Sequence, residues 1–424
     1  MTRLRDYAGP LLAGAALAVG SWAFVSYVPV FRYWLFGDAR YFDAWGGMIA
    51  GHAVPYRDFH LEYPPGAIPM FVLPVYLRKL AGYHGTYFYW LRVEILACQL
   101  LSLVAMAWAL SRLSASRRRA YAALCTAGVA SAVLGPIAFF HYDAWPTLFA
   151  VTALAALLAG RGVLSCTLAA AGAAAKVFPV VLIPFALVEL WRRGRWRAAG
   201  AGALAAAAVV ALTVGPFAVV APHGVGWAIH REAGRPLEDE SVGSSIFVAA
   251  HELGLYHLHV VVSAGSHNFG GAGPDAVVRA LSILTALGLL AVYLLWLRTP
   301  GTPDDLVLAA VTAVVAYIVF SKVFSPQYLV WLIPLVPLIR GRLGVAATGG
   351  MLAILAVTQV FEPYNQGRYW RFSTPWIDWT VVARNVLVVA FLGLLSAALV
   401  RRAALRRAEA PAPARLDYDL PGRP

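Results

Sequence analysis

Apolar segments long enough to cross a lipid bilayer follow one another along almost the whole of this chain. A transmembrane helix needs about 20 predominantly apolar residues, and the links between these segments are mostly short. The composition agrees, because 60% of the 424 residues are hydrophobic and only 13% are charged, whereas about a quarter of a soluble domain is charged. The sequence therefore predicts an all-α integral membrane protein embedded in a lipid bilayer.

About twelve apolar stretches are candidate spans, so we predict a polytopic helix bundle of about 12 transmembrane segments. The stretch 66–80 contains two prolines and ends in Arg78 and Lys79, so we expect a re-entrant or interfacial helix there. The first apolar run continues to Val30 without a small-residue cleavage site, which favours an uncleaved first helix over a signal peptide. The candidate spans are 10–30, 86–110, 120–140, 144–159, 163–175, 178–191, 198–220, 276–297, 304–321, 326–339, 343–361 and 377–400.

The net charge of +13 comes largely from arginine clusters in the short links between apolar segments. This distribution indicates membrane orientation and argues against a nucleic-acid partner. The positive-inside rule places these clusters, and both termini, in the cytoplasm. We therefore predict a transmembrane domain over 1–408, with extracytoplasmic loops at 31–85, 221–275 and 362–376, and a disordered cytoplasmic tail over 409–424.

Unusual polar stretches fall on the predicted outer side of the membrane, which predicts one composite site on that face. The sequence contains no G-x-S-x-G, Walker A, H-E-x-x-H or dinucleotide-binding fingerprint. Its three cysteines lie in apolar runs without the spacing of a disulfide framework or a metal site. The outward polar stretches are 37–66, 141–143, Lys176, 231–241, 321–328 and 362–371.

Two carboxylates stand out where the first apolar segment ends. Asp38 follows that segment within a few residues, near Arg40 and several aromatic residues, where partial burial would suit a general base. Glu62 precedes the rigid sequence Tyr-Pro-Pro, which would hold it at the mouth of the bundle. The alternative for Glu62 is a loop carboxylate paired with Arg57 or Arg40.

Lysine is rare in this chain, and two of its three lysines, Lys176 and Lys322, interrupt apolar sequence. An ionisable residue in such a place costs about 2.5–3.5 kcal/mol at the centre of a helix, so it is expected to have a partner or a task. The two lysines either extend to the outer headgroups or bind an anionic group delivered from the lipid, most simply a phosphate. Arg235 would complete this cationic set, or would form an exposed loop salt bridge with Glu238 or Glu240.

The sequence His-Tyr-Asp places His141 and Asp143 at a turn between two apolar segments. Metal binding needs more ligands at defined spacing, so we predict no metal at this point. We expect Asp143 either to cap the helix that begins at Ala144 or to line the site.

Motifs spread over nearly the whole chain resemble those of the GT-C fold, and most closely glycosyltransferase family eighty-seven, the polyprenyl-phosphate-mannose-dependent mannosyltransferases. The resemblance depends on the order and spacing of all these motifs together. They are Asp38 to Tyr41 followed by GHAVPYRDFHLEYPP, then HYDAWP, AAKVFPVVLIP, RPLEDESVGSS, KVFSPQYLVWLIPL and TQVFEPYN with a later ARN.

The resemblance implies an inverting transferase of the plasma (inner) membrane with its site on the extracytoplasmic face. It implies that Asp38 deprotonates a hydroxyl of a glycolipid or glycan acceptor, which attacks the anomeric carbon of a polyprenyl-phosphate sugar. The donor phosphate would then contact Lys176, Lys322 and Arg235, and no metal or other cofactor is expected. Glu62, His141 and Asp143 are the remaining residues that we expect to bind substrate.

One departure from the family and two alternative functions stay open. This chain reads LEDES where LQIES is expected in relatives, so an extra acid either alters acceptor choice or lies in solvent. A secondary transporter or lipid flippase would use inverted repeats, and the segments around Lys176 and Lys322 resemble each other weakly. A non-catalytic subunit of an envelope complex would tolerate replacement of Asp38. We expect tyrosines and tryptophans near the outer loops to stack on a sugar or to form an interfacial belt.

Overall fold

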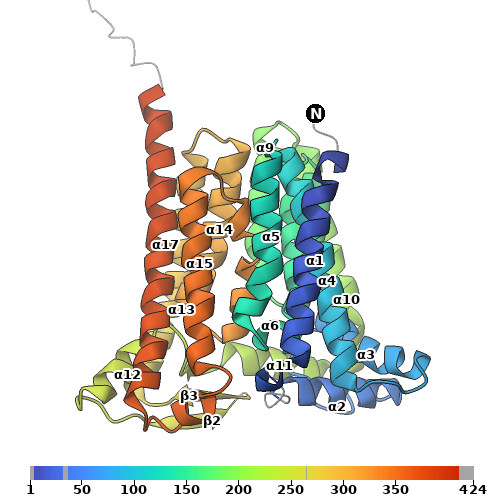
Figure 1. Cartoon of the computed structure of the whole chain (residues 1–424), viewed down its shortest axis with the longest axis vertical. Coiled ribbons are helices and arrows are strands. Elements are labelled where there is room, and N and C mark those ends of the chain that lie inside the picture. Colours follow the sequence, from blue (N-terminus) through green and yellow to red (C-terminus); the bar gives the residue numbers. More distant parts are fainter. Residues whose placement is uncertain (1–3, 32–36, 264, 410–424) are drawn as a thin grey trace, which may run out of the picture.

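Long helices running side by side form most of the molecule (Figure 1). The computed structural model describes residues 4–31, 37–263 and 265–409. Within these residues seven helices are long and apolar enough to cross a membrane, so the chain is an α-helical membrane protein. These helices are α1 (Ala8–Tyr27), α4 (Tyr87–Arg112), α10 (Trp196–Val220), α13 (Ala272–Leu297), α14 (Pro303–Phe320), α15 (Gly341–Phe361) and α17 (Pro375–Glu409).

The other predicted spans correspond to helical elements that are shorter or interrupted. Span 178–191 consists of a 3-10 turn followed by a short α-helix, and span 326–339 consists of two 3-10 turns. Proline explains these interruptions, because it lacks the N–H that an α-helix interior requires. The shorter or interrupted elements that correspond to the other predicted spans are α5 (Arg117–Leu134), α6 (Ile137–Phe140), α7 (Ala144–Leu158), α8 (Gly162–Ala175), η4 (Phe178–Leu182), α9 (Ile183–Arg192), η5 (Pro326–Leu332) and η6 (Val336–Leu338).

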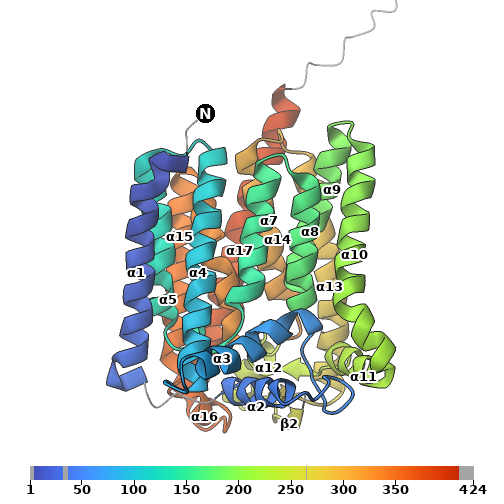
Figure 2. The same cartoon turned by 90° about the vertical axis from the view of Figure 1, so that its right-hand side faces the viewer.

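Most of the polar elements gather at one end of the bundle, whereas α1 begins and α17 ends at the opposite end (Figures 1 and 2). The segments predicted as outer loops contribute these elements, and α2 and α3 lie across the end of the bundle (Figure 2). The tail from residue 410 lies outside the described residues. The elements at this end are η2 (Pro29–Phe31), α2 (Ala39–Ala50), η3 (Pro65–Ala67), α3 (Ile68–Leu80), α11 (Pro222–Ala233), α12 (Ser245–Glu252) and α16 (Gln366–Tyr369).

A small antiparallel sheet, which the sequence did not predict, lies at the same end of the molecule. Its order is β1 (Leu237–Glu238), β3 (Ser266–Phe269), β2 (Val260–Ser263). Leu237 pairs with Phe269, and both side chains are buried in a small cluster with residues of α12 and α13. The strands are too short to give a clear alternation of apolar and polar residues, which is why the sequence pattern does not reveal them.

Small residues allow the first helix to approach the bundle closely. A Cβ atom on Gly14 of α1 would lie 2.8 Å from the carbonyl oxygen of Leu124 on α5, and one on Gly128 would meet the carbonyl oxygen of Gly14. The hydroxyl of Ser21 also donates to the carbonyl of Gly128 at 2.8 Å. Close backbone approach through small residues is a common way to pack helices in lipid, where water does not drive apolar surfaces together.

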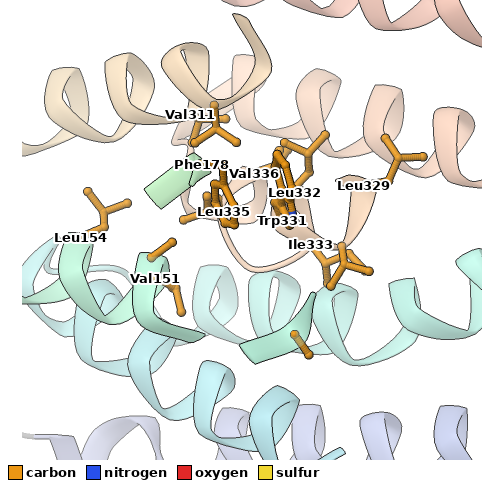
Figure 3. Close-up of a cluster of buried hydrophobic side chains, with 14 of the residues drawn as sticks. Val151, Leu154, Phe178, Val311, Leu329, Trp331, Leu332, Ile333, Leu335 and Val336 are labelled. Atoms are coloured by element: carbon orange, nitrogen blue, oxygen red, sulfur yellow. The ribbon is translucent and has the colours of Figure 1, made fainter. Parts of the chain in front are cut away.

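The centre of the bundle is filled by apolar side chains from α7, η4, α14 and η5 (Figure 3). The rings of Phe178 on η4 and Trp331 on η5 stack with centroids 3.9 Å apart and an angle of 7° between their planes. Val151 and Leu154 of α7 and Val311 of α14 pack around this pair. The two interrupted segments therefore meet in the core, and each starts just after one of the unusual lysines.

Candidate active site

A cavity of about 650 Å³ opens at the end of the bundle where the polar segments meet. Its lining comes from α2, the loop before η3, α11, the segment around β1, η5 and α16, so segments far apart in the sequence build it together. Among the described residues that line the cavity, seven have carboxyl side chains and three are lysine or arginine. The carboxyl groups are Asp38, Glu62, Glu232, Glu238, Asp239, Glu240 and Glu362, and the bases are Lys176, Arg231 and Arg235.

Asp38 lies immediately before α2 and borders this cavity with its carboxylate 33% exposed. The hydroxyl of Tyr63 donates to Asp38 Oδ2 at 3.3 Å, and Nε2 of His141 lies 3.8 Å from the same oxygen. His141 Nδ1 is 3.2 Å from the carbonyl oxygen of Ile137, which can only accept a hydrogen bond. Nδ1 therefore carries a proton, and Nε2 faces the aspartate.

The turn that carries Tyr63 is fixed by its packing against the bundle. A Cβ atom on Gly66 would lie 2.5 Å from the carbonyl oxygen of Ala174, so only glycine fits where this turn meets the end of α8. The carbonyl of Gly66 accepts a hydrogen bond of 3.0 Å from Nε1 of Trp145. The Tyr63 ring packs edge-on against Tyr142, with 5.1 Å between their centroids. This packing brings Tyr63 close to Asp38.

Lys176 and Asp143 form a buried ion pair instead of serving separate functions. Lys176 Nζ lies 2.7 Å from Asp143 Oδ1, and Trp331 Nε1 donates to the same oxygen at 2.7 Å. The lysine ammonium also lies over the rings of Tyr328, Tyr142 and Trp331, at 4.6, 5.2 and 5.6 Å from their centroids. Asp143 makes no side-chain cap to α7, so the capping prediction was wrong. The aspartate instead balances the lysine charge.

Glu62 pairs with an arginine that the sequence did not suggest. Its Oε1 lies 2.6 Å from Nη2 of Arg231 on α11, whereas Arg57 pairs with its neighbour Asp58 at 2.8 Å. The guanidinium of Arg231 also lies over the ring of Trp227, 5.0 Å from its centroid. Glu62 and Arg231 both line the cavity, so the pair joins the first polar loop to α11.

Arg235 is largely buried, which corrects the prediction of an exposed salt bridge. Its side chain is 14% exposed, with Nη1 3.5 Å from Glu232 Oε2 and Nη2 3.7 Å from Glu238 Oε1. Nη2 also donates to the hydroxyl of Ser266 at 3.0 Å. Of the two predicted partners, Glu238 is present within 4 Å, and both Arg235 and Glu238 line the cavity.

Lys322 lies beside the cavity, outside its described lining. Its ammonium donates to the carbonyl oxygen of Ala233 at 2.6 Å, and its own carbonyl accepts from the N–H of Glu238 at 3.0 Å. Burial and the neighbouring Arg235 lower the pKa of Lys322. The similar sequences around Lys176 and Lys322 therefore place the two lysines in different surroundings, and only Lys176 borders the cavity.

Three carboxyl groups that the sequence analysis did not select form a buried part of the lining. Asp239, Glu240 and Glu362 are 2%, 4% and 3% exposed, so the acids of LEDES do not lie in solvent as one interpretation allowed. Burial raises the pKa of all three, to about 8 for Glu240. Their stretches were recognisable as polar interruptions, but nothing in the sequence indicates that they would be buried together.

The cavity thus combines partly exposed carboxylates, Asp38 among them, with paired cations and three buried carboxyl groups. Among the described residues no group of three or more His, Cys, Asp or Glu side chains is arranged to hold a metal ion. Neither the protein-family models nor the curated proteins that were compared give a match to this chain. Its function is therefore inferred from the chemistry of the cavity.

Proposed function

We propose that this protein is a membrane glycosyltransferase that moves a sugar, most simply mannose, from a polyprenyl-phosphate donor to a glycolipid or glycan hydroxyl. Asp38 takes the proton of the acceptor hydroxyl, and the oxygen then attacks the anomeric carbon from the face opposite the phosphate. The bond between that carbon and the phosphate oxygen breaks, its electron pair stays on polyprenyl phosphate, and the configuration inverts.

The position of Asp38 is the observation that carries this proposal. A general base must reach its proton at hydrogen-bond distance, and Asp38 borders a cavity large enough for a sugar while remaining 33% exposed. The Tyr63 hydroxyl donates to the carboxylate, which borders the cavity where the acceptor would bind. Lys176, Arg231 and Arg235 line the same cavity and would attract the charge of the leaving phosphate.

Each of these cations already has a carboxylate partner within 4 Å. A donor phosphate would therefore share the cation with that carboxylate or replace it, and a phosphate bound in this way would gain less than at a free cation. Lys322, which does not border the cavity, is assigned no contact with the donor in this proposal, although the sequence suggested one.

The proposal includes the topology that the sequence predicts. About 12 crossings of a GT-C-like bundle would place the cavity on the extracytoplasmic face of the plasma membrane and both termini in the cytoplasm. The polar end of the bundle, opposite the start of α1 and the end of α17, supports this arrangement (Figure 1). A lipid-borne donor would then present its phosphate at the headgroup level, where the acceptor arrives from water.

A transporter or flippase is the second candidate, but the apolar centre of the bundle does not favour it. The helices that flank the cavity continue into the buried apolar cluster of Figure 3, where a transport path would need polar groups. Fluorescent lipid reporters in vesicles test this candidate directly, because a flippase moves them between leaflets without forming a product.

The decisive experiment offers radiolabelled polyprenyl-phosphate mannose and a mixed glycolipid extract to the purified protein in lipid. Asp38→Asn is compared with wild type, and Asp58→Asn is the matched control, because Asp58 lies in the same loop and pairs with Arg57. We expect label to move to a new glycolipid with wild type and Asp58→Asn but not with Asp38→Asn. Full turnover by a normally folded Asp38→Asn protein would reject Asp38 as the base, and other polyprenyl-linked sugars would be offered if wild type transfers no label.

A further inference from the structure

We infer that Asp239, Glu240 and Glu362, here called the acidic wall, together with the stacked pair His267 and Trp370, form a subsite that binds an uncharged sugar ring. In the proposed reaction this ring belongs to the acceptor, so that assignment depends on the proposed function. The binding of the ring itself does not depend on it. All five side chains line the cavity that Asp38 also borders.

Each residue of the acidic wall has one buried oxygen that lacks a hydrogen-bond partner among the described residues. These oxygens are Asp239 Oδ2, Glu240 Oε2 and Glu362 Oε2. A buried polar atom without a partner costs about 1–3 kcal/mol, and native structures contain few of them. Three such atoms belong to residues that line one cavity, where the hydroxyl groups of a ligand can supply the missing hydrogen bonds.

Hydrogen bonds from α16 and α17 hold the three residues of the acidic wall in position. Gln366 Nε2 donates to Glu362 Oε1 at 2.9 Å. The hydroxyl of Tyr369 donates to the carbonyl of Asp239 at 2.7 Å, and Arg384 Nη2 donates to the carbonyl of Glu240 at 2.6 Å. The wall is therefore held in place before any ligand binds, which is the condition for specific recognition.

The chemistry of the wall favours hydroxyl groups over a metal ion or an anion. The carboxyl groups are not arranged around one point as metal ligands are, within the described residues. Burial raises the pKa of all three, which favours their protonated forms, and a protonated carboxyl group both donates and accepts hydrogen bonds, as sugar hydroxyls do. A ligand anion would find no lysine or arginine among the five residues of this subsite, and the bases elsewhere in the cavity lining, Lys176, Arg231 and Arg235, each have a carboxylate partner.

A flat aromatic pair borders the same part of the cavity. The rings of His267 and Trp370 stack with centroids 4.3 Å apart and 6° between their planes. The N–H of Asp239 donates to the carbonyl of His267 at 3.1 Å, so the pair is joined directly to the acidic wall. Sugar rings have apolar C–H faces that pack on large aromatic rings, while their hydroxyls require polar partners at the edge. The site offers both.

Saturation-transfer NMR on the full chain in lipid nanodiscs tests this subsite without turnover. The probes are methyl α-D-mannopyranoside, which is uncharged, and methyl α-D-glucopyranosiduronate, which carries a carboxylate. The variants are Trp370→Ala and Glu362→Met, and the second one keeps the approximate length of the side chain if the first affects folding. The controls are Trp376→Ala, an exposed tryptophan at the same end, and Glu189→Gln, which pairs with Arg193.

We expect wild type and both controls to bind the mannopyranoside at least roughly tenfold more tightly than the uronate. Loss of a stacking surface or of a buried hydrogen-bond partner should weaken mannopyranoside binding roughly tenfold in Trp370→Ala and Glu362→Met. Equal binding of the two probes, no binding by wild type, or unchanged binding in both variants would overturn the inference. Sugar binding without transfer from any polyprenyl-linked donor would reject the proposed function but keep the subsite. Sugar transfer by wild type, together with unchanged mannopyranoside binding in both variants, would keep the proposed function but reject the subsite.

Discussion

Lys176 and Asp143 are 33 residues apart in the sequence, yet their side chains meet at 2.7 Å beneath the cavity. The aspartate is 1% exposed and the lysine 15%, so water screens this pair weakly. Trp331 shares the same aspartate oxygen. The pair therefore links the end of α8, the start of α7 and η5. It supports the structure of the bundle, and Lys176 also lines the cavity.

Removing one partner of this pair should destabilise the protein more than removing both. Asp143→Asn leaves the Lys176 ammonium without its counter-charge, and Lys176→Met leaves the buried carboxylate uncompensated. We expect either single variant to lose about 3–5 kcal/mol of unfolding free energy. The double variant should lose less than either single variant, because no unpaired charge remains. Thermal and denaturant unfolding in nanodiscs measures this cycle, and additive losses would show that the pair does not act as a unit.

The hydroxyl of Tyr63 should matter for activity through the orientation of Asp38. Tyr63→Phe removes the 3.3 Å hydrogen bond and leaves the packing against Tyr142 intact. A hydrogen bond of this kind contributes about 0.5–1.5 kcal/mol, so kcat/KM for sugar transfer should fall roughly two- to tenfold. The change should appear in kcat and leave donor binding unaltered, because Tyr63 acts on the base and not on the phosphate.

The matched control for Tyr63 is Tyr76→Phe on α3, where the tyrosine is 44% exposed and lies beside Lys79. This variant should transfer sugar at the wild-type rate. If the two phenylalanine variants behave alike, Tyr63 does not orient the base.

The sequence was sufficient to predict a helical membrane protein and the location of its polar end. The signal for long helices is strong because each needs about 20 apolar residues in a row. The polar interruptions between apolar runs also marked most of the segments that meet at the cavity. The small sheet around 237–269 was not predicted, because its strands are only 2 to 4 residues long.

Side-chain partners could not be predicted from the sequence, since they depend on how distant segments pack. Lys176 and Lys322 occur in nearly the same local sequence, yet one borders the cavity and the other donates to the carbonyl of Ala233. Glu62 pairs with Arg231, 169 residues away by number, instead of with an arginine in its own loop. The sequence could not decide whether the acids around β1 lie in solvent, because their burial comes from α16 and α17, which follow more than 100 residues later.

The different positions of the two lysines lead to different expectations for donor binding. Lys176→Gln should weaken binding of a polyprenyl-phosphate sugar about tenfold, because it removes a cation from the cavity lining. Lys322→Gln should change the affinity less than about twofold, since its ammonium is engaged by the carbonyl of Ala233. Equilibrium binding of a fluorescent donor analogue to the folded variants measures both. Equal effects of the two substitutions would contradict this division.

The acidic wall should make the protein less stable as the pH rises from about 4.5 to 8. Burial raises the pKa of Glu240 to about 8 from its ordinary value of 4.5, so in this pH range the folded protein holds a proton that the unfolded chain has lost. The stabilisation relative to alkaline solution is fully present below pH 4.5 and disappears as the pH passes 8, with a limiting slope of about 1.4 kcal/mol per pH unit for each proton. Asp239 and Glu362 act in the same direction. The apparent melting temperature in nanodiscs should therefore fall between pH 5 and 8, and Glu240→Gln should flatten the decline whereas Glu189→Gln should not. A melting temperature that rises with pH, or an unchanged slope in Glu240→Gln, would show that the wall is ionised in the folded protein.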